Sequence, residues 1–311
     1  MPSLTSLLPV LPESYSLTLA DVGSAGGLKD RWKPVASRVN ALLFEPREDG
    51  GAAEQSGRNR IFPVALGAAP GRAELNITAM ANMSSMLRPN ASLLGRFRKK
   101  GAHAEVTSQQ VVAVDTLDAL LERERLQVDA LKVDTQGSEL EILQGAARAL
   151  ENSVVLAEVE ISFIERYEGQ ATAPTLIAWM QARGFQLIEI YRPKRYRHLN
   201  SLGVGNVGTG AGHRAGQLAY ADAIFMVGEP LFARRLALLP RDEAVHQVLS
   251  ALMALMVYGK ADTAAALFDQ HHALLDPPLA AALRRWLGRW HRAEYGRRGL
   301  HLVLDYLARK V

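Results

Sequence analysis

A succession of short apolar runs, separated by segments of helical or loop character, restricts the fold of this chain more than any other feature. The runs are four to eight residues long, which suits buried strands better than buried helices. Buried strands that alternate with helices build a parallel sheet with helices on both faces. We therefore predict an α/β fold with a doubly wound sheet, whose strands are Leu17–Val22, Ala41–Phe44, Ile61–Ala65, Ala130–Val133, Val154–Ile161, Phe185–Tyr191 and Asp222–Val227.

Helical patterns lie between these runs and also follow the last one. The clearest is Gly137–Leu150, where apolar residues recur at helical spacing. Strand signals stop after Pro230, so we predict an N-terminal arm at 1–16, an α/β domain at 17–229 and a helical C-terminal extension at 230–311. The other predicted helices are Leu28–Val39, Thr116–Glu124 with Asp115 as its N-cap, Ala173–Arg183, Glu243–Met256, Asp262–His271 and Leu279–Tyr306.

The composition excludes several classes of protein. The 311 residues contain no cysteine, which rules out disulfides, cysteine-bound metals and thiol nucleophiles. The longest strongly apolar stretch, Leu249–Tyr258, is about half as long as a membrane-spanning helix. The N-terminus has no secretory signal pattern, so we expect a cytoplasmic protein. The net charge of +4 comes from residues 281–311, and the rest of the chain predicts no nucleic-acid groove.

The first predicted strand ends in a glycine-rich turn, DVGSAGG, at Asp21–Gly27. Such a turn lets a ligand approach the backbone. A dinucleotide-binding turn would have glycine in place of Asp21, because a carboxylate repels pyrophosphate, and this argues against an NAD-dependent oxidoreductase. Glu45 follows the second strand, where an acid can accept hydrogen bonds from both ribose hydroxyls. Together these acids predict a nucleoside with a positive charge, as in S-adenosylmethionine.

A second group of polar residues lies at the ends of two later strands. Asp134, Gln136 and Glu139 follow the fourth predicted strand, at the edge where open α/β sheets bind ligands. An alternative interpretation of Glu139 is a first-turn acid that stabilises the helix dipole. Glu158 and Glu160 are two residues apart on the fifth strand and therefore share a face. These acids lack the partners of an octahedral magnesium site, so we predict no metal.

Seven blocks of the sequence resemble, in order and spacing, those of the FkbM-type methyltransferases. The most specific block is LKVDTQGSELEILQGA at Leu131–Ala146, and the resemblance covers roughly residues 17–228. It implies a class I S-adenosylmethionine-dependent methyltransferase with a Rossmann-like, seven-stranded sheet whose last strand is antiparallel. The family is associated with O-methylation of hydroxyl groups on sugars, polysaccharides and polyketides. The other blocks are Asp21–Gly27, Phe44–Pro46, Val64–Leu75, Ser84–Leu87, Val114–Leu121 and Leu156–Gln170.

The resemblance also implies which residues bind the cofactor. Asp134–Glu139 would border the transferred methyl group. The helix after the first motif departs from the family pattern, because it contains Pro34. The residues expected to bind the methionine part are Asp21, Gly23, Ser24 and Gly26, with Glu45 expected at the ribose and the turn of Leu66 and Gly67 at the adenine.

Methyl transfer to a hydroxyl group needs a base that takes the proton. We expect Asp134 or Glu158 to be this base and Gln136 to orient the acceptor. If the last strand is antiparallel, the basic loop Arg192–Ala221 leaves the sheet at the same edge and would hold an anionic or sugar acceptor. The residues expected to contact this small-molecule or glycan acceptor are Glu139, Glu160, Tyr167, Arg192 and Arg195.

An alternative function is a non-catalytic adaptor, which would bind the cofactor and dock an anionic partner through its basic helical tail. The tail contains the sequence RRWLGRWHRAEYGRR at Arg284–Arg298. Trp286 and Trp290, four residues apart, are typical of a packed helix face rather than of a partner site. Capture of a partner without methyl turnover would favour the adaptor.

Overall fold

A computed structural model describes residues 3–23, 27–46, 54–205 and 215–290. The chain divides into two compact units. We call them the sheet unit, formed by Thr18–Gly27 and Asn40–Arg234, and the helical unit, formed by Met1–Leu17, Leu28–Val39 and Arg235–Val311. The domain boundaries expected after residues 16 and 229 stay a prediction. Within the described ranges, none of the helices has the length and apolar character needed to cross a bilayer.

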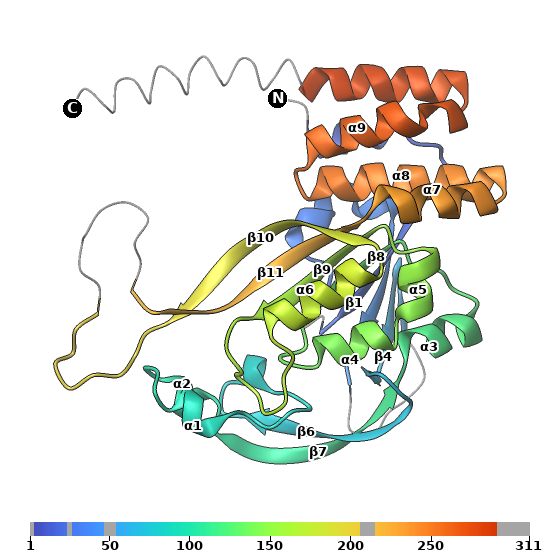
Figure 1. The fold of residues 1–311 in the computed structure, drawn as a ribbon. Coiled ribbons are helices and arrows are strands. Elements are labelled where there is room, and N and C mark those ends of the chain that lie inside the picture. Colours follow the sequence, from blue (N-terminus) through green and yellow to red (C-terminus); the bar gives the residue numbers. More distant parts are fainter. Residues whose placement is uncertain (1–2, 24–26, 47–53, 206–214, 291–311) are drawn as a thin grey trace, which may run out of the picture. The chain divides into compact units, whose positions relative to one another are not determined.

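An eight-stranded sheet forms the centre of the sheet unit, in the order β10-β11-β9-β8-β1-β2-β4-β3 (Figure 1). Strand β11 runs antiparallel to β9 and β10, whereas β1, β8 and β9 are parallel neighbours. The expected Rossmann-like sheet with an antiparallel last strand is confirmed, and the short edge strand β3 brings the count to eight instead of seven. The strands are β1 (Leu17–Val22), β2 (Val39–Phe44), β3 (Glu54–Ser56), β4 (Asn59–Phe62), β8 (Ala130–Val133), β9 (Leu156–Ser162), β10 (Phe185–Tyr196) and β11 (Gln217–Val227).

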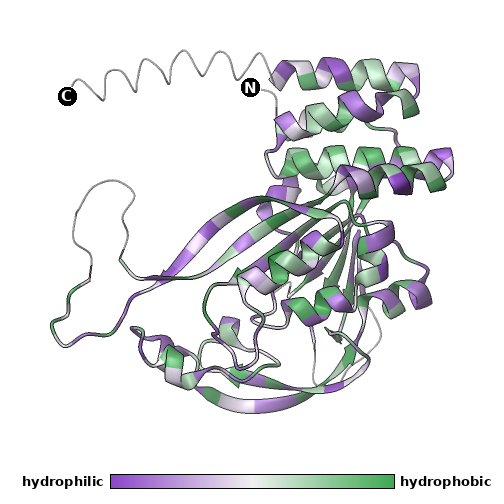
Figure 2. Cartoon of the chain, in the orientation of Figure 1, coloured by the Kyte–Doolittle hydropathy of each residue, from purple (hydrophilic) through white to green (hydrophobic). Residues whose placement is uncertain are grey.

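The last two strands are longer than their apolar patterns predict. Strand β10 continues to Tyr196, which pairs with Gln217 at the start of β11. The expectation that 192–221 is a loop throughout is therefore wrong, because both of its ends belong to an antiparallel ribbon. The outer part of β10 is hydrophilic, as Figure 2 shows, so apolar patterning does not reveal it.

The segment from Gly67 to Val111 contains most of a second sheet. This sheet has three strands in the order β5-β7-β6, with β6 and β7 antiparallel over most of their length. The elements of this region are β5 (Ala65–Leu66), β6 (Gly71–Thr78), η3 (Ala81–Met83), α1 (Ala91–Leu94), α2 (Lys100–His103) and β7 (Val106–Asp115).

A capping hydrogen bond explains where helix α3 begins. Helix α3 is capped by Thr116, whose hydroxyl accepts a hydrogen bond from the amide of Ala119 (3.1 Å), and Asp115 was the wrong prediction for this role. Asp115 instead accepts a hydrogen bond from the amide of Thr116 at 2.8 Å. The helices are α3 (Leu117–Glu124), α4 (Glu139–Gln144), α5 (Ala147–Asn152), α6 (Ala173–Ala182) and α7 (Glu229–Leu238), the last of which ends in the helical unit.

The single helix predicted at Gly137–Leu150 is in fact two helices, α4 and α5. The Asp118 carboxylate accepts hydrogen bonds from the amides of Arg148 (2.7 Å) and Ala149 (2.9 Å), so it caps the first turn of α5. The break lies at Gly145. A β-carbon there would come within 2.0 Å of the Gly67 carbonyl oxygen, so only glycine allows this close approach.

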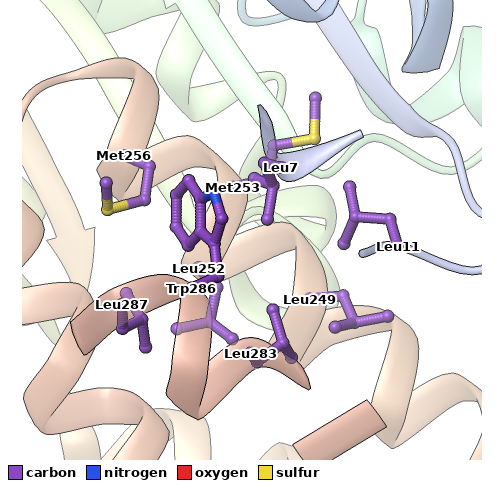
Figure 3. Close-up of a pocket in the computed structure, with 9 residues that line it drawn as sticks. All are labelled: Leu7, Leu11, Leu249, Leu252, Met253, Met256, Leu283, Trp286 and Leu287. Carbon is purple, nitrogen blue, oxygen red and sulfur yellow. The ribbon is translucent and has the colours of Figure 1, made fainter. Parts of the chain in front are cut away.

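The helical unit combines segments from both ends of the chain with residues 28–39. Where a helix was expected after the first strand, the chain forms a 3-10 helix, η2 (Asp30–Arg38), which contains Pro34. Nine apolar side chains surround a cavity of about 10 Å³, which has room for at most one water molecule (Figure 3). The other elements are η1 (Leu4–Leu7), α8 (Arg241–Val257), α9 (Ala261–His271), η4 (His272–Leu274) and a helix at 277–290.

Candidate active site

A row of charged residues crosses three central strands. Asp21 on β1 pairs with Lys132 on β8, which in turn pairs with Glu158 on β9, so all three side chains lie on one face of the sheet. The Lys132 ammonium donates a hydrogen bond to the Asp21 carboxylate (3.2 Å) and lies 3.8 Å from a carboxylate oxygen of Asp134. Three carboxylates thus surround one buried cation.

The carboxylates determine the protonation of Lys132. Burial by itself would lower the pKa of this lysine, but Asp21, Asp134 and Glu158 together outweigh burial and raise it. Lys132 is therefore a permanent cation, and its charge compensates only part of the surrounding negative charge. Glu158 is held from its other side by Tyr191, whose hydroxyl donates to the carboxylate at 2.6 Å.

A second acidic row lies two residues further along the same strands. Glu160 on β9 pairs with Asp222 on β11, and Asp134 directly follows β8. Burial, together with the negative charges of Glu158 and Asp134, raises the pKa of Asp222 to about 6, while Lys132 opposes this shift. Burial also raises the pKa of Glu160, against the influence of its ion-pair partner Arg166.

The turn after β8 holds its polar residues in an unusual backbone conformation. Gln136 has a φ of 62° and Gly137 a φ of 126°, so the chain reverses direction sharply. Glu139 stabilises this turn, because its carboxylate accepts hydrogen bonds from the amides of Thr135 (3.0 Å) and Gly137 (2.9 Å). Glu139 was predicted to contact the acceptor. In the structure its carboxylate is bonded to the backbone of its own turn.

The side chain of Gln136 is fixed by partners on both of its polar atoms. Its amide nitrogen donates to Asp134 (3.0 Å), and its oxygen accepts from the guanidinium of Arg166 (3.2 Å). Arg166 is fully buried; it also donates to Ser162 (3.1 Å) and forms an ion pair with Glu160. The hydroxyl of Tyr167 donates to the carbonyl of Met83 at 2.9 Å.

The residues expected at the ribose and adenine lie at the ends of β2 and β5. Glu45 is exposed directly after β2, where its amide donates to the Phe62 carbonyl (3.1 Å). Leu66 is buried at the end of β5, and the amide of Gly67 donates to the Asp115 carbonyl (3.0 Å).

The remaining predicted residues divide into those on β10 and those in the first motif. Arg192 and Arg195 are exposed on β10, where Arg192 lies over the ring of Tyr191 and Arg195 donates to the Gly216 carbonyl (3.2 Å). Gly23 is described, with a φ of 82°, whereas Ser24 and Gly26 lie outside the described residues.

Sequence reasoning missed four residues of this network: Lys132, Arg166, Tyr191 and Asp222. Lys132 and Arg166 lie inside the blocks Leu131–Ala146 and Leu156–Gln170 that carry the resemblance, whereas Tyr191 and Asp222 lie outside all seven blocks. In the described part of the chain, no three His, Asp or Glu residues are grouped so that they could hold a metal ion.

The chain is similar to a known protein family and to a solved structure. A family model described as the methyltransferase FkbM domain matches residues 32–187, just over half of the chain. The crystal structure of methyltransferase FkbM from Methylobacillus flagellatus KT is 13% identical, with a TM-score of 0.34, over 72% of this chain and 48% of that one. The chain thus spans about half the length of that protein. Among curated proteins there is no match.

Proposed function

Because the chain belongs to the FkbM methyltransferase family, we propose that it transfers a methyl group from S-adenosylmethionine to a hydroxyl oxygen of a sugar, a polysaccharide or another small molecule. The observation that carries this proposal is the arrangement of Asp21, Asp134 and Glu158 around a single cation, Lys132. Three carboxylates and one ammonium leave the site negatively charged. A negative site favours a sulfonium cofactor over a nicotinamide dinucleotide, whose pyrophosphate it would repel.

The glycine turn is consistent with this cofactor. A β-carbon on Gly23 would lie 2.0 Å from the Asp134 carbonyl oxygen, so the end of β1 is pressed directly against the turn after β8. This contact brings the first motif next to the acidic residues. Asp21 and Gly23 would hold the methionine part of the cofactor, Glu45 the ribose, and Leu66 with Gly67 the adenine. When bound, the cofactor supplies an electrophilic methyl group on a positively charged sulfur.

The chain itself must orient the acceptor hydroxyl and remove its proton. Of the two carboxylates proposed as the base, Asp134 has a side chain that is 34% exposed, whereas Glu158 is buried and bound by Tyr191. We therefore propose that Asp134 is the base that takes the proton of the acceptor hydroxyl. Gln136 is fixed from both sides and would orient the acceptor, and Glu158 would keep Lys132 and Tyr191 in place.

The acceptor contacts proposed from the sequence divide into two groups. Glu139, Glu160 and Tyr167 are buried and bonded to other groups of the protein, so we propose that they position the turn and Gln136. Arg192 and Arg195 are exposed on β10 and remain proposed contacts for an anionic or sugar acceptor.

Calorimetric titration tests the cofactor first. The protein should bind S-adenosylmethionine and S-adenosylhomocysteine but not NAD. The variants Glu45→Gln and Asp21→Asn should bind both adenosyl ligands more weakly. The exposed Glu54→Gln on the edge strand is a matched control that should change nothing. If neither adenosyl ligand binds, the cofactor assignment is wrong and the adaptor becomes the leading alternative.

Transfer of radiolabelled methyl groups to a panel of sugars and polysaccharides tests the reaction. Asp134→Asn should retain the affinity for S-adenosylhomocysteine and lose about 100-fold or more in turnover, because asparagine cannot accept the proton of the acceptor hydroxyl. Glu158→Gln is the comparison variant, and a smaller effect is expected. Equal turnover of Asp134→Asn and the unmodified protein would refute Asp134 as the base.

A further inference from the structure

Two segments of the sheet unit carry only positive charge, whereas the rest of the unit is acidic overall. Residues 88–100 and 192–197 contain nine Lys or Arg and no Asp or Glu. The remainder of the sheet unit has 12 basic and 23 acidic residues. The nine side chains, which we call the basic platform, are Arg88, Arg96, Arg98, Lys99, Lys100, Arg192, Lys194, Arg195 and Arg197, and all except the half-buried Lys100 are exposed.

The two segments are joined by their backbones. The amide of Arg98 donates to the Arg197 carbonyl (2.8 Å), and the amide of Leu199 donates to the Arg96 carbonyl (2.8 Å). Between these bonds, the rings of Phe97 and His198 pack 4.7 Å apart. Helices α1 and α2 and the outer end of the β10–β11 ribbon accordingly lie toward the same side of the sheet unit in Figure 1.

An apolar cluster fixes the platform to the unit. Phe97 and Tyr196 are buried together with Met83, Leu94 and Ile164, and the Lys100 ammonium lies 4.5 Å from the Tyr196 ring centre. The cluster therefore fixes the part of the platform around Phe97 and Tyr196, next to which Arg96, Arg98 and Arg197 lie in the sequence. Exposed positive charges on a fixed surface attract an anionic surface.

Exposed aliphatic side chains adjoin the basic platform. Leu199, Leu202 and Val204 are 58%, 84% and 55% exposed, respectively. Asn200 shapes this turn, because its side chain donates to the Val204 carbonyl and accepts from the Val204 amide, both at 2.9 Å. Leu202 thus lies within a turn whose ends are joined by the hydrogen bonds between Asn200 and Val204. Three exposed aliphatic residues within six positions form an apolar feature that a soluble polyanion would not cover.

We propose that the basic platform and the turn Leu199–Val204 bind the surface of a bilayer that contains anionic phospholipid. The lysines and arginines would face the lipid phosphates, and Leu202 would enter the headgroup region. Basic residues beside exposed apolar side chains are the combination that interfacial binding requires, because electrostatic attraction and apolar burial act together. A soluble polyanion would satisfy the charges alone. The platform shares Arg192 and Arg195 with the proposed acceptor contacts, whereas Arg98, Arg197 and Leu202, which the test changes, have no proposed role in methyl transfer.

Co-sedimentation with vesicles tests the proposal on the full chain. Vesicles of phosphatidylcholine mixed with phosphatidylserine should bind the protein at least about tenfold more tightly than vesicles of phosphatidylcholine alone. Arg98→Ala and Arg197→Ala should each weaken binding about fivefold. Leu202→Ser should weaken it about threefold or more, because it removes apolar burial and no charge.

Two control variants have the same chemistry outside the platform. Arg72→Ala removes an exposed cation of β6, and Val111→Ser removes an exposed aliphatic side chain of β7. Both should leave vesicle binding unchanged. Circular dichroism of every variant checks that the fold is retained. The proposal is overturned if the protein does not distinguish the two vesicle types, or if it binds dextran sulfate as tightly as anionic vesicles and Leu202→Ser has no effect on either.

Discussion

The backbone of Asp134 occupies the space that a side chain on Gly23 would need: an ideal β-carbon on Gly23 would lie 2.0 Å from the Asp134 carbonyl oxygen. Gly23 also has a φ of 82°, a conformation that L-residues other than glycine rarely adopt. The glycine is therefore required for two separate reasons, and a second glycine allows them to be distinguished.

Gly23→Ala should be more destabilising than Gly27→Ala. Gly27 has nearly the same φ, 81°, but a β-carbon there would meet no atom within 4 Å. Gly27→Ala should thus cost only the backbone strain, about 1 kcal/mol. Gly23→Ala should cost about 2 kcal/mol more, because the Asp134 carbonyl must move, and it should abolish cofactor binding. Urea unfolding and calorimetry measure both effects, and equal costs for the two variants would contradict the steric explanation.

Glu139→Gln should destabilise the turn after β8. The amides of Thr135 and Gly137 both donate to one carboxylate oxygen, and the Gly137 amide also donates to the other oxygen, where glutamine would place an NH2 group. We expect a loss of about 1–2 kcal/mol in the free energy of unfolding. Glu141→Gln, two residues further along α4, is the matched control and should be nearly neutral. A neutral Glu139→Gln would show that the turn does not depend on this carboxylate.

The preference for the charged cofactor should depend on the protonation of Asp222. The raised pKa of about 6 means that Asp222 gains its negative charge only as the pH rises through that value. The additional charge favours the sulfonium of S-adenosylmethionine over the uncharged sulfur of S-adenosylhomocysteine. The affinity ratio of the two ligands should therefore rise about two- to fivefold between roughly pH 5 and pH 7.

Asp222→Asn provides the control for this pH dependence, because asparagine resembles the protonated carboxyl group at every pH. Titration of both ligands across the range should then give a constant affinity ratio. A slope that persists in this variant would assign the titration to another group.

Gly145→Ala should disturb the proposed adenine turn from a distance. The α4–α5 break places Gly145 against the Gly67 carbonyl, and a β-carbon would come within 2.0 Å of that oxygen. The expected cost is about 2–3 kcal/mol, with weaker binding of both adenosyl ligands. Gly71→Ala, where a β-carbon would meet nothing within 4 Å, should leave both quantities unchanged. Unaltered cofactor affinity in Gly145→Ala would exclude the Gly67 turn from the binding site.

The sheet was predictable where its strands are buried on both faces. Every residue of β8 and β9 is buried, and the apolar runs located these strands within two residues of their bounds. The outer ends of β10 and β11 were not predictable, because residues 192–196 are mostly basic. Their pairing partners are about 20 positions away along the chain, and no local pattern reports such pairing.

The residues of the candidate site were predictable where they lie on or directly after a predicted strand. Asp134, Gln136, Glu158 and Glu160 do lie together, as their positions along the sequence indicated. Arg166 could not be anticipated, because an arginine after a strand is normally exposed and this one is buried among the partners Glu160, Gln136 and Ser162. Asp222 approaches the site because β11 lies beside β9, and this follows from topology rather than from residue pattern.

The segment between the first two strands of the sheet belongs to the helical unit. Within that unit, Trp32 is 1% exposed and its ring meets that of Tyr258 edge to face, with 6.0 Å between the centres. The C-terminal extension is therefore not a detachable module. A truncation that removed it would take away Tyr258 and leave Trp32 uncovered in the connection between β1 and β2. Any chimera that exchanges the extension for that of a relative must exchange residues 28–39 with it.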